Sequence, residues 1–181
     1  MISTETRTAL PVGTWELDPV HSSIGFEISY MVGAFRGQFR EVEARLDGTS
    51  EGVKLVGVAK VSSVDVKDEN LAAHLQTPDF FDAERHPELR FESSDIEASG
   101  DRLTVRGDLT IKGVTKPVDL QGSLTETVTD AYGRDRLGLR LETTVDRTEF
   151  GVNWNVPLPS GQPALADEVS LAAELYLVRE A

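Results

Sequence analysis

The sequence contains no cysteine among its 181 residues. This excludes a disulfide scaffold, a thiol nucleophile, a CxxC redox pair and any cysteine-ligated zinc or iron–sulfur site. No run of 18 or more apolar residues occurs either, so no segment of the sequence is typical of a transmembrane helix. Residues 1–8 lack the basic and apolar regions of a secretory signal, and we therefore expect a cytoplasmic protein.

Basic and aromatic residues are both scarce. Eighteen Lys and Arg residues stand against 31 Asp and Glu residues, which gives a formal net charge of −13. This charge repels the phosphates of nucleic acid and of anionic membranes, so we expect no nucleic-acid partner. Aromatic residues make up only 7%, which leaves few large side chains to fill a wide interior.

The length and the hydrophobic fraction indicate one folded domain. A chain of 181 residues is little longer than an average domain, and 39% hydrophobic residues suffice for a core. Residues 1–11 are polar and show no periodicity. We expect them to form a flexible N-terminal lead, followed by a single domain over residues 12–181.

Apolar and polar residues alternate along most of the chain, which is typical of strands with one buried face. The clearest alternating segments are residues 24–30, 42–46, 103–111, 118–124, 137–145 and 169–177. Turn signals separate them at Asp47-Gly48, Ser99-Gly100-Asp101, Lys112-Gly113 and Tyr132-Gly133. The pattern predicts a long antiparallel meander.

One stretch departs from this alternation. Between Asp68 and Gln76 the apolar spacing changes to four, and Asp68 is a suitable N-cap, so the pattern predicts a short helix. The following Thr77-Pro78-Asp79 resembles a second helix start, with proline at the first helical position and an end before Pro87.

The expected fold class is all-β, with one or two short helices. Strands that each bury one face can form a sandwich or a closed barrel, and closure removes the exposed edges. We therefore favour an antiparallel up-and-down β-barrel of about eight strands. A barrel of this size can be filled by its own side chains or can hold one small ligand.

The three histidines show no metal-ligand spacing, and we expect no metal site. His21 lies between Asp18 and Ser22, but the sequence has no Gly-x-Ser-x-Gly elbow to present a catalytic serine. The favoured interpretation of His21 is a polar turn residue, and that of His74 is a hydrogen-bonded residue of the core or of a pocket rim. His86 is expected in an exposed turn.

Two segments of this acidic chain contain basic residues and no acid. They are residues 31–40, which include Arg36, and residues 109–118, which include Lys112. Such segments could hold an anionic head group beside an apolar cavity. The alternative, which the residues alone favour, is that these side chains are solvated or paired with the surrounding acids.

Taken in order, several motifs resemble the YceI family of lipid-binding proteins, over about residues 13–178. The motifs are Trp15-Glu16-Leu17-Asp18-Pro19-Val20-His21-Ser22, Ile24-Gly25-Phe26, Val32-Gly33-Ala34-Phe35-Arg36-Gly37-Gln38-Phe39, Ser62-Ser63-Val64-Asp65, His74-Leu75, Asp79-Phe80-Phe81-Asp82-Ala83, His86-Pro87, Phe91-Glu92-Ser93, Gly107-Asp108-Leu109-Thr110-Ile111-Lys112-Gly113-Val114-Thr115-Lys116-Pro117-Val118, Asp146-Arg147 and Phe150-Gly151.

The resemblance implies a lipocalin-like antiparallel barrel, with the short helix beside it, that encloses a polyisoprenoid or a similar amphiphilic chain. It implies a binding protein rather than an enzyme, and some relatives are linked to isoprenoid quinone metabolism, transport or stress. The ligand would be the lipid itself, and no cofactor and no catalytic residue are expected. The oligomeric state is left undecided, and a homodimer is one alternative.

Candidate ligand-binding residues are of two kinds. The apolar candidates for the lining are Phe26, Ile28, Phe35, Phe39, Phe81, Phe91, Phe150 and Trp154. The polar candidates for contacts with a head group are His21, Arg36, His74, Lys112 and Arg147.

Three functions remain to be compared. The leading one is a soluble carrier of a long-chain isoprenoid or similar lipid, which requires a hollow barrel. The alternative is an enzyme that acts on such a lipid, with His21 or His74 as acid or base. The third is an interaction module, which requires a filled lumen and an exposed apolar patch outside the barrel.

Overall fold

A computed structural model describes residues 9–181, and residues 1–8, most of the expected N-terminal lead, lie outside the described part. The strands are β1 (Gly13–Leu17), β2 (Ser23–Tyr30), β3 (Gly33–Phe39), β4 (Val42–Thr49), β5 (Gly52–Lys60), β6 (Val64–Asp65), β7 (Glu88–Ser99), β8 (Arg102–Ile111), β9 (Val114–Leu124), β10 (Val128–Thr129), β11 (Asp135–Asp146) and β12 (Leu165–Arg179). The helices are α1 (Glu69–Leu75) and the 3-10 turns η1 (Val61–Ser63) and η2 (Arg147–Phe150).

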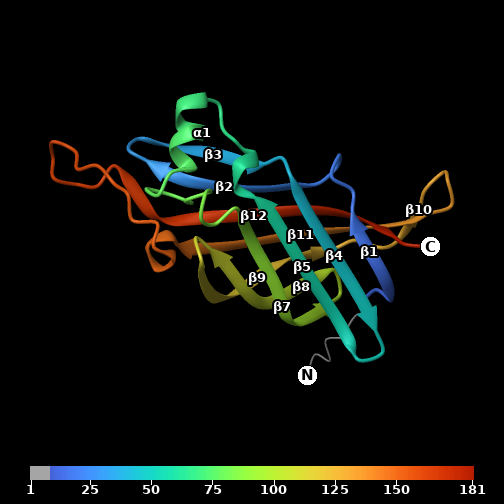
Figure 1. The fold of residues 1–181 in the computed structure, drawn as a ribbon. Coiled ribbons are helices and arrows are strands. Elements are labelled where there is room, and N and C mark those ends of the chain that lie inside the picture. The colour runs from blue at the N-terminus through green and yellow to red at the C-terminus, as the bar shows by residue number, and fades with distance from the viewer. Residues whose placement is uncertain (1–8) are drawn as a thin grey trace, which may run out of the picture.

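Eight of these strands close into an antiparallel barrel, in the order β11-β9-β8-β7-β5-β4-β1-β12 (Figure 1). The ring closes because β12 pairs with β11 as well as with β1. Closure satisfies the backbone donors and acceptors of strands that would otherwise be edges. The expectation of an all-β, lipocalin-like barrel is confirmed.

The long strand β12 carries two partners on one edge. Residues 177–179 pair with β1, and residues 165–174 pair with β2. The β2–β3 hairpin therefore continues the wall of the barrel beyond β1 and β4, and β6 adds to its outer edge. This arrangement lengthens the interior at the end of the barrel where α1 lies (Figure 1).

The predicted short helix is present as α1, and the Asp68 side chain accepts a hydrogen bond from the Leu71 amide at 3.0 Å. The second helix, expected after Thr77, is not formed. Residues 78–85 make turns instead, because Asp82 adopts a left-handed backbone with φ 52°. That conformation occurs in single residues and cannot continue a right-handed helix.

One turn signal proves to have another cause. Gly48 lies inside β4 and is buried, and the chain reverses after it. A Cβ at Gly48 would lie 1.9 Å from the Pro11 carbonyl oxygen, so glycine is required there for close approach rather than for a turn. Leu10 also packs against the core, so the segment just before residue 12 lies against the barrel.

The interior consists of two apolar clusters. One cluster forms a closed floor around Trp15, Val105 and Leu177, whose exposed fractions are 3% or less. The other cluster, at the α1 end, contains Phe26 and Phe150 together with side chains from α1 and from the segment after it. A cavity lies between the two clusters: it borders most buried side chains of the second cluster and also Ala44, Leu55, Leu141 and Leu175 of the first.

Candidate functional site

An apolar cavity of about 180 Å³ occupies the barrel between the floor and α1. Its lining on β12 runs from Leu165 to Leu175, a distance of about 33 Å at roughly 3.3 Å per residue. We call this elongated apolar space the channel. Ile24, Leu109 and Leu171 line it and are only partly buried, because they border this space rather than packed side chains.

Aromatic rings form one side of the channel. The Phe26 ring lies 5.9 Å from that of Phe39 and 6.3 Å from that of Phe81, and Phe39 and Phe81 are 5.8 Å apart. Gly37, opposite Phe26 on β3, makes this possible, since a Cβ there would come within 2.5 Å of the Phe26 ring. The absence of a side chain at Gly37 therefore leaves the space that the Phe26 ring occupies.

Seven of the eight apolar candidates line the channel: Phe26, Ile28, Phe35, Phe39, Phe81, Phe91 and Phe150. Trp154 does not line it. Its ring packs on Phe80, at 5.3 Å, and on His74, at 5.0 Å, while Phe80 itself lines the channel. Trp154 and His74 therefore form a layer behind the lining, and His74 Nε2 lies 3.0 Å from Asp79 Oδ2.

Arg147 is the one polar candidate at the channel, and it is 5% exposed. Its Nη1 donates to the carbonyls of Val152 and Trp154, and its Nε donates to that of Ala166, all at 2.8 Å. These bonds tie together the two ends of the loop between η2 and β12. Burial lowers the pKa of Arg147, and the carboxylate of Asp167, 3.8 Å from Nη2, opposes this shift.

The remaining polar candidates are occupied by other contacts. Lys112 donates from Nζ to the carbonyls of Pro78, at 2.5 Å, and Gly151, at 3.2 Å. Arg36 lies on the outer face and pairs with Glu27 at 2.8 Å. The two acid-free segments therefore do not form an anion site. Arg36 pairs with an acid, as the alternative interpretation of these segments predicts.

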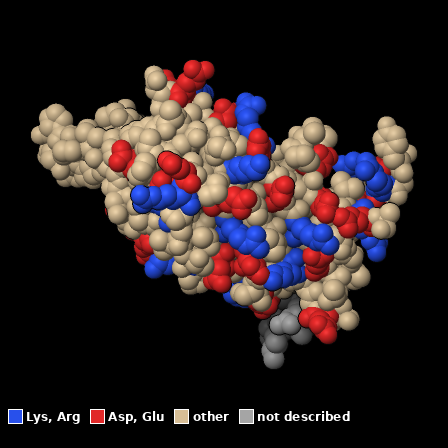
Figure 2. All heavy atoms as spheres, viewed as in Figure 1, with Lys and Arg blue, Asp and Glu red and all other residues tan. Residues whose placement is uncertain are grey.

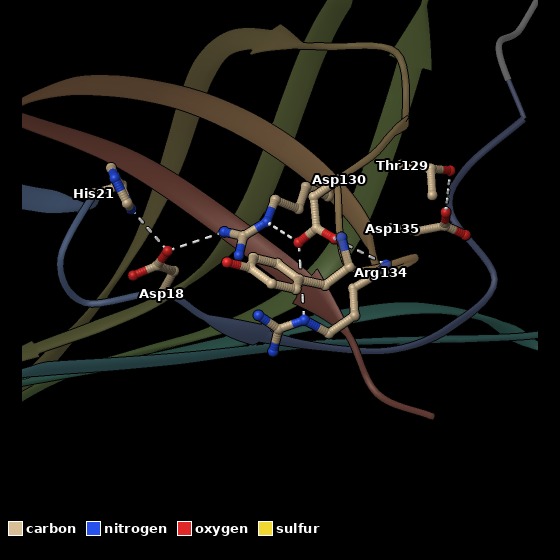
Figure 3. Close-up of polar contacts among 8 residues, drawn as sticks. Asp18, His21, Thr129, Asp130, Arg134 and Asp135 are labelled. Atoms are coloured by element: carbon tan, nitrogen blue, oxygen red, sulfur yellow. Dashed lines mark hydrogen bonds and ion pairs between the residues drawn. The ribbon is translucent and has the colours of Figure 1, made fainter.

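His21 lies outside the channel, near the β10 end of the barrel (Figure 3). Its Nδ1 is 2.8 Å from Asp18 Oδ2, which also accepts from Arg136 at 3.0 Å. The contact with His21, assisted by Arg136, lowers the pKa of Asp18. Arg136 also donates to Asp130 at 2.8 Å, and this bond, with backbone amide donors, lowers the pKa of Asp130 to about 2.

Several channel residues were not among the candidates. They come from α1, from the segment after it, from the loop after η2 and from the inner faces of β5, β8 and β12, and include Gly57, Leu75, Phe80, Leu109, Ile111, Val152, Leu165, Val169, Leu171, Ala173 and Leu175. Alternation alone marks those on β8 and β12 as inward-facing. Leu75 and Phe80 carry no such signal, because their position depends on how the chain folds over the barrel end.

Within residues 9–181, no group of three or more His, Asp or Glu side chains is arranged to hold a metal ion. No helix in this part of the chain is long and apolar enough to cross a membrane.

The fold and the channel together define a class of protein, an eight-stranded antiparallel barrel with an apolar interior site. The sequence profile of the YceI-like domain family matches residues 15–177. A UPF0312 protein of Photorhabdus laumondii is 31% identical over 149 residues, 80% of this chain and 77% of that protein. Protein YceI of Escherichia coli O157:H7 is 29% identical over 140 residues, 75% of this chain and 73% of that protein. The chain belongs to the YceI-like family.

Solved structures share this fold. BcnA of Burkholderia cenocepacia superposes with a TM-score of 0.75 at 22% identity, over 88% of this chain and 98% of that one. A polyisoprenoid binding domain from Saccharophagus degradans gives a TM-score of 0.72 at 10% identity, over 92% of this chain and 98% of that one. At these identities the likeness shows the fold alone.

Proposed function

We propose that this protein binds a long-chain isoprenoid or a similar amphiphilic lipid, with the apolar tail in the barrel channel. The observation that carries the proposal is the channel itself, lined almost entirely by apolar side chains. An apolar cavity without polar partners stays dry, so an apolar chain can enter it without displacing bound water. A carrier role in isoprenoid quinone metabolism, transport or storage, in the cytoplasm, belongs to the same proposal.

The dimensions of the channel indicate how a tail would fit. A compact cavity of roughly 150 Å³ accepts one benzene ring. The 180 Å³ present here thus matches one to two five-carbon isoprene units. The length of about 33 Å along β12 would accommodate more units only if lining side chains move outward. Each five-carbon unit buried contributes about 4 kcal/mol before the cost of ordering the tail.

Two comparisons support the proposal. The chain belongs to the YceI-like family, and one structure with the same fold is described as a polyisoprenoid binding domain. Binding along an apolar wall discriminates weakly between tails, because one methylene changes affinity by only about 1–3 kcal/mol. We therefore expect a class of tails to bind rather than one compound.

The other two functions have less support. An enzyme acting on a bound tail would need His21 or His74 at the channel, and neither lines it. Both imidazoles lie instead against carboxylates, Asp18 and Asp79, outside the lining. A pure interaction module would need a filled lumen, whereas this barrel is hollow. A binding protein rather than an enzyme is the better account.

The proposal is tested by extraction. Protein purified without detergent is treated with organic solvent, and the extract is analysed by mass spectrometry. We expect a long-chain apolar compound from the wild type and none from Phe35→Asp, which places a carboxylate in the lining. Circular dichroism of the variant checks that it folds. An extract empty of such compounds, together with failure to bind added geranylgeraniol, would refute the proposal.

A further inference from the structure

An uncharged projection extends from one end of the barrel, at the left in Figures 1 and 2. It consists of the loop at residues 151–166 and the end of the β2–β3 hairpin, residues 28–35; we call these two segments the apolar prong. Neither segment contains Asp, Glu, Lys or Arg, although such residues make up 27% of the chain. Charged side chains cover the body of the barrel but not this end (Figure 2).

The hairpin turn of the prong lacks the residues that turns of this kind usually contain. Met31 has a left-handed backbone with φ 48°, a conformation that favours glycine or asparagine, and two-residue hairpin turns prefer Asn-Gly. Met31 is 54% exposed and Val32 is 107% exposed. The turn thus gives up stability and presents two apolar side chains to solvent. Departures of this kind point to function rather than folding.

The prong is held as one unit. The Met31 amide donates to the Ala164 carbonyl at 2.9 Å, which joins the hairpin to the loop. The Asn155 side chain both donates to and accepts from the Leu165 backbone, at 2.8 and 3.0 Å. Arg147 clamps the base of the loop by its three carbonyl bonds. The exposed apolar side chains are therefore presented on a fixed support.

The channel reaches the base of the prong. Ile28 and Phe35 are paired across the hairpin and both line the channel, two residues from the turn. Leu165, also in the lining, pairs with Tyr30. The apolar lining and the apolar outer surface are thus adjacent along the same strands.

We propose that the apolar prong docks in the headgroup region of a lipid bilayer whose surface carries little or no net charge. This inference rests on the proposed function, because docking would let a tail pass between bilayer and channel with little exposure to water. The formal charge of −13 repels anionic surfaces, which favours a bilayer with little net charge as the partner of the uncharged projection. Tyr30 adds a side chain that suits the membrane interface.

A bilayer fits this surface better than a second copy does. The prong is narrow and convex, whereas a stable dimer needs about 800 Å² of complementary surface on each partner. Two copies of a chain with this net charge also repel each other. The first acids beside the loop, Glu149 and Asp167, lie at its base, which leaves only the far part of the prong to enter the headgroup region.

The test is flotation of the wild-type protein with phosphatidylcholine vesicles. We expect Val32→Asp to weaken vesicle binding about tenfold. The substitution removes an apolar side chain that the bilayer would bury, and it adds a charge. Val128→Asp is the matched control, because Val128 is 64% exposed on β10, outside the prong, and should bind as the wild type does. Met31→Asn should also weaken binding, while it favours the left-handed backbone and keeps the fold.

Vesicles that contain phosphatidylglycerol provide a second measurement. Binding to them should be weaker at low salt and should recover as salt screens the repulsion, the reverse of the behaviour of a basic membrane-binding segment. Wild-type protein that does not float, or Val32→Asp that floats as the wild type does, would overturn the proposal. The proposal would also be overturned if the only effect of Val32→Asp were to convert a dimer into a monomer, as measured by sedimentation.

Membrane docking and lipid binding in the channel can be tested independently of each other. Binding of geranylgeraniol added in solution should be the same for the wild type and Val32→Asp, because Val32 is not in the lining. Floating protein that binds no prenol would refute lipid carriage and leave docking intact. Prenol binding without flotation would refute docking alone.

Discussion

Filling the channel at Gly57 should make the protein more stable and its lipid binding weaker. Gly57 lies between Leu55 and Ala59 on the inner face of β5 and lines the channel. A Cβ built there meets only one atom within 4 Å, the Glu43 carbonyl oxygen at 3.9 Å, and its φ is not in the left-handed region. Gly57→Phe therefore directs a side chain toward the channel without backbone strain and without a clash at its Cβ.

The magnitudes follow from the dimensions of the channel. Replacing a strand glycine contributes about 0.5–1 kcal/mol and burying the Phe side chain about 1.5–3 kcal/mol, so the free energy of unfolding should rise by about 2 kcal/mol or more. The ring needs roughly 150 Å³, which is most of the 180 Å³ present. A tail that loses one isoprene unit loses about 4 kcal/mol, and we expect binding at least about a hundredfold weaker.

The assay compares urea unfolding with titration of geranylgeraniol for the wild type, Gly57→Phe and the control Val56→Phe. Val56 lies next to Gly57 on the same strand, outside the lining, so its substitution should leave binding unchanged. If Gly57→Phe binds the prenol as tightly as the wild type, the tail does not occupy this channel. If Gly57→Phe is destabilised while Val56→Phe is not, the space beside Gly57 is not open.

Two other predictions concern polar groups. Arg147→Lys cannot reproduce the planar three-carbonyl clamp, so unfolding should become easier by about 2 kcal/mol and amide exchange in residues 151–166 should accelerate; unchanged exchange would contradict the clamp. The Asp130 pKa of about 2 lies below its ordinary value, so its stabilising contribution is present above about pH 4 and lost as pH falls through 2. Asp130→Asn should flatten the stability profile in that window, and an unaltered profile in acid titrations would exclude the ion pair with Arg136.

The sequence predicts the barrel and most of the aromatic side chains in its lining, because the side-chain period of a strand directly assigns each residue to a face. Phe26, Ile28, Phe35 and Phe39 follow from alternation on two strands that both face the channel. The position of a residue along the barrel axis does not follow from alternation. Trp154, for instance, is aromatic but lies behind Phe80.

Polar contacts are predicted less well, because their partners are distant in sequence. Lys112 bonds carbonyls of Pro78 and Gly151, which lie 34 and 39 residues away, and no local pattern identifies them. The same applies to Arg147, whose third carbonyl partner is Ala166, 19 residues away. Composition does locate the prong, because residues 151–166 lack charge, but only the structure shows that they project beside the β2–β3 turn.

The most direct test of lipid binding inside the barrel is the location of a bound tail. Intermolecular nuclear Overhauser effects between geranylgeraniol and methyl-labelled protein report which side chains touch it. We expect contacts with Leu109, Val169 and Leu171 in the channel, and none with the floor residue Val105. Contacts restricted to exposed methyl groups such as those of Val20 and Val128 would contradict binding inside the barrel.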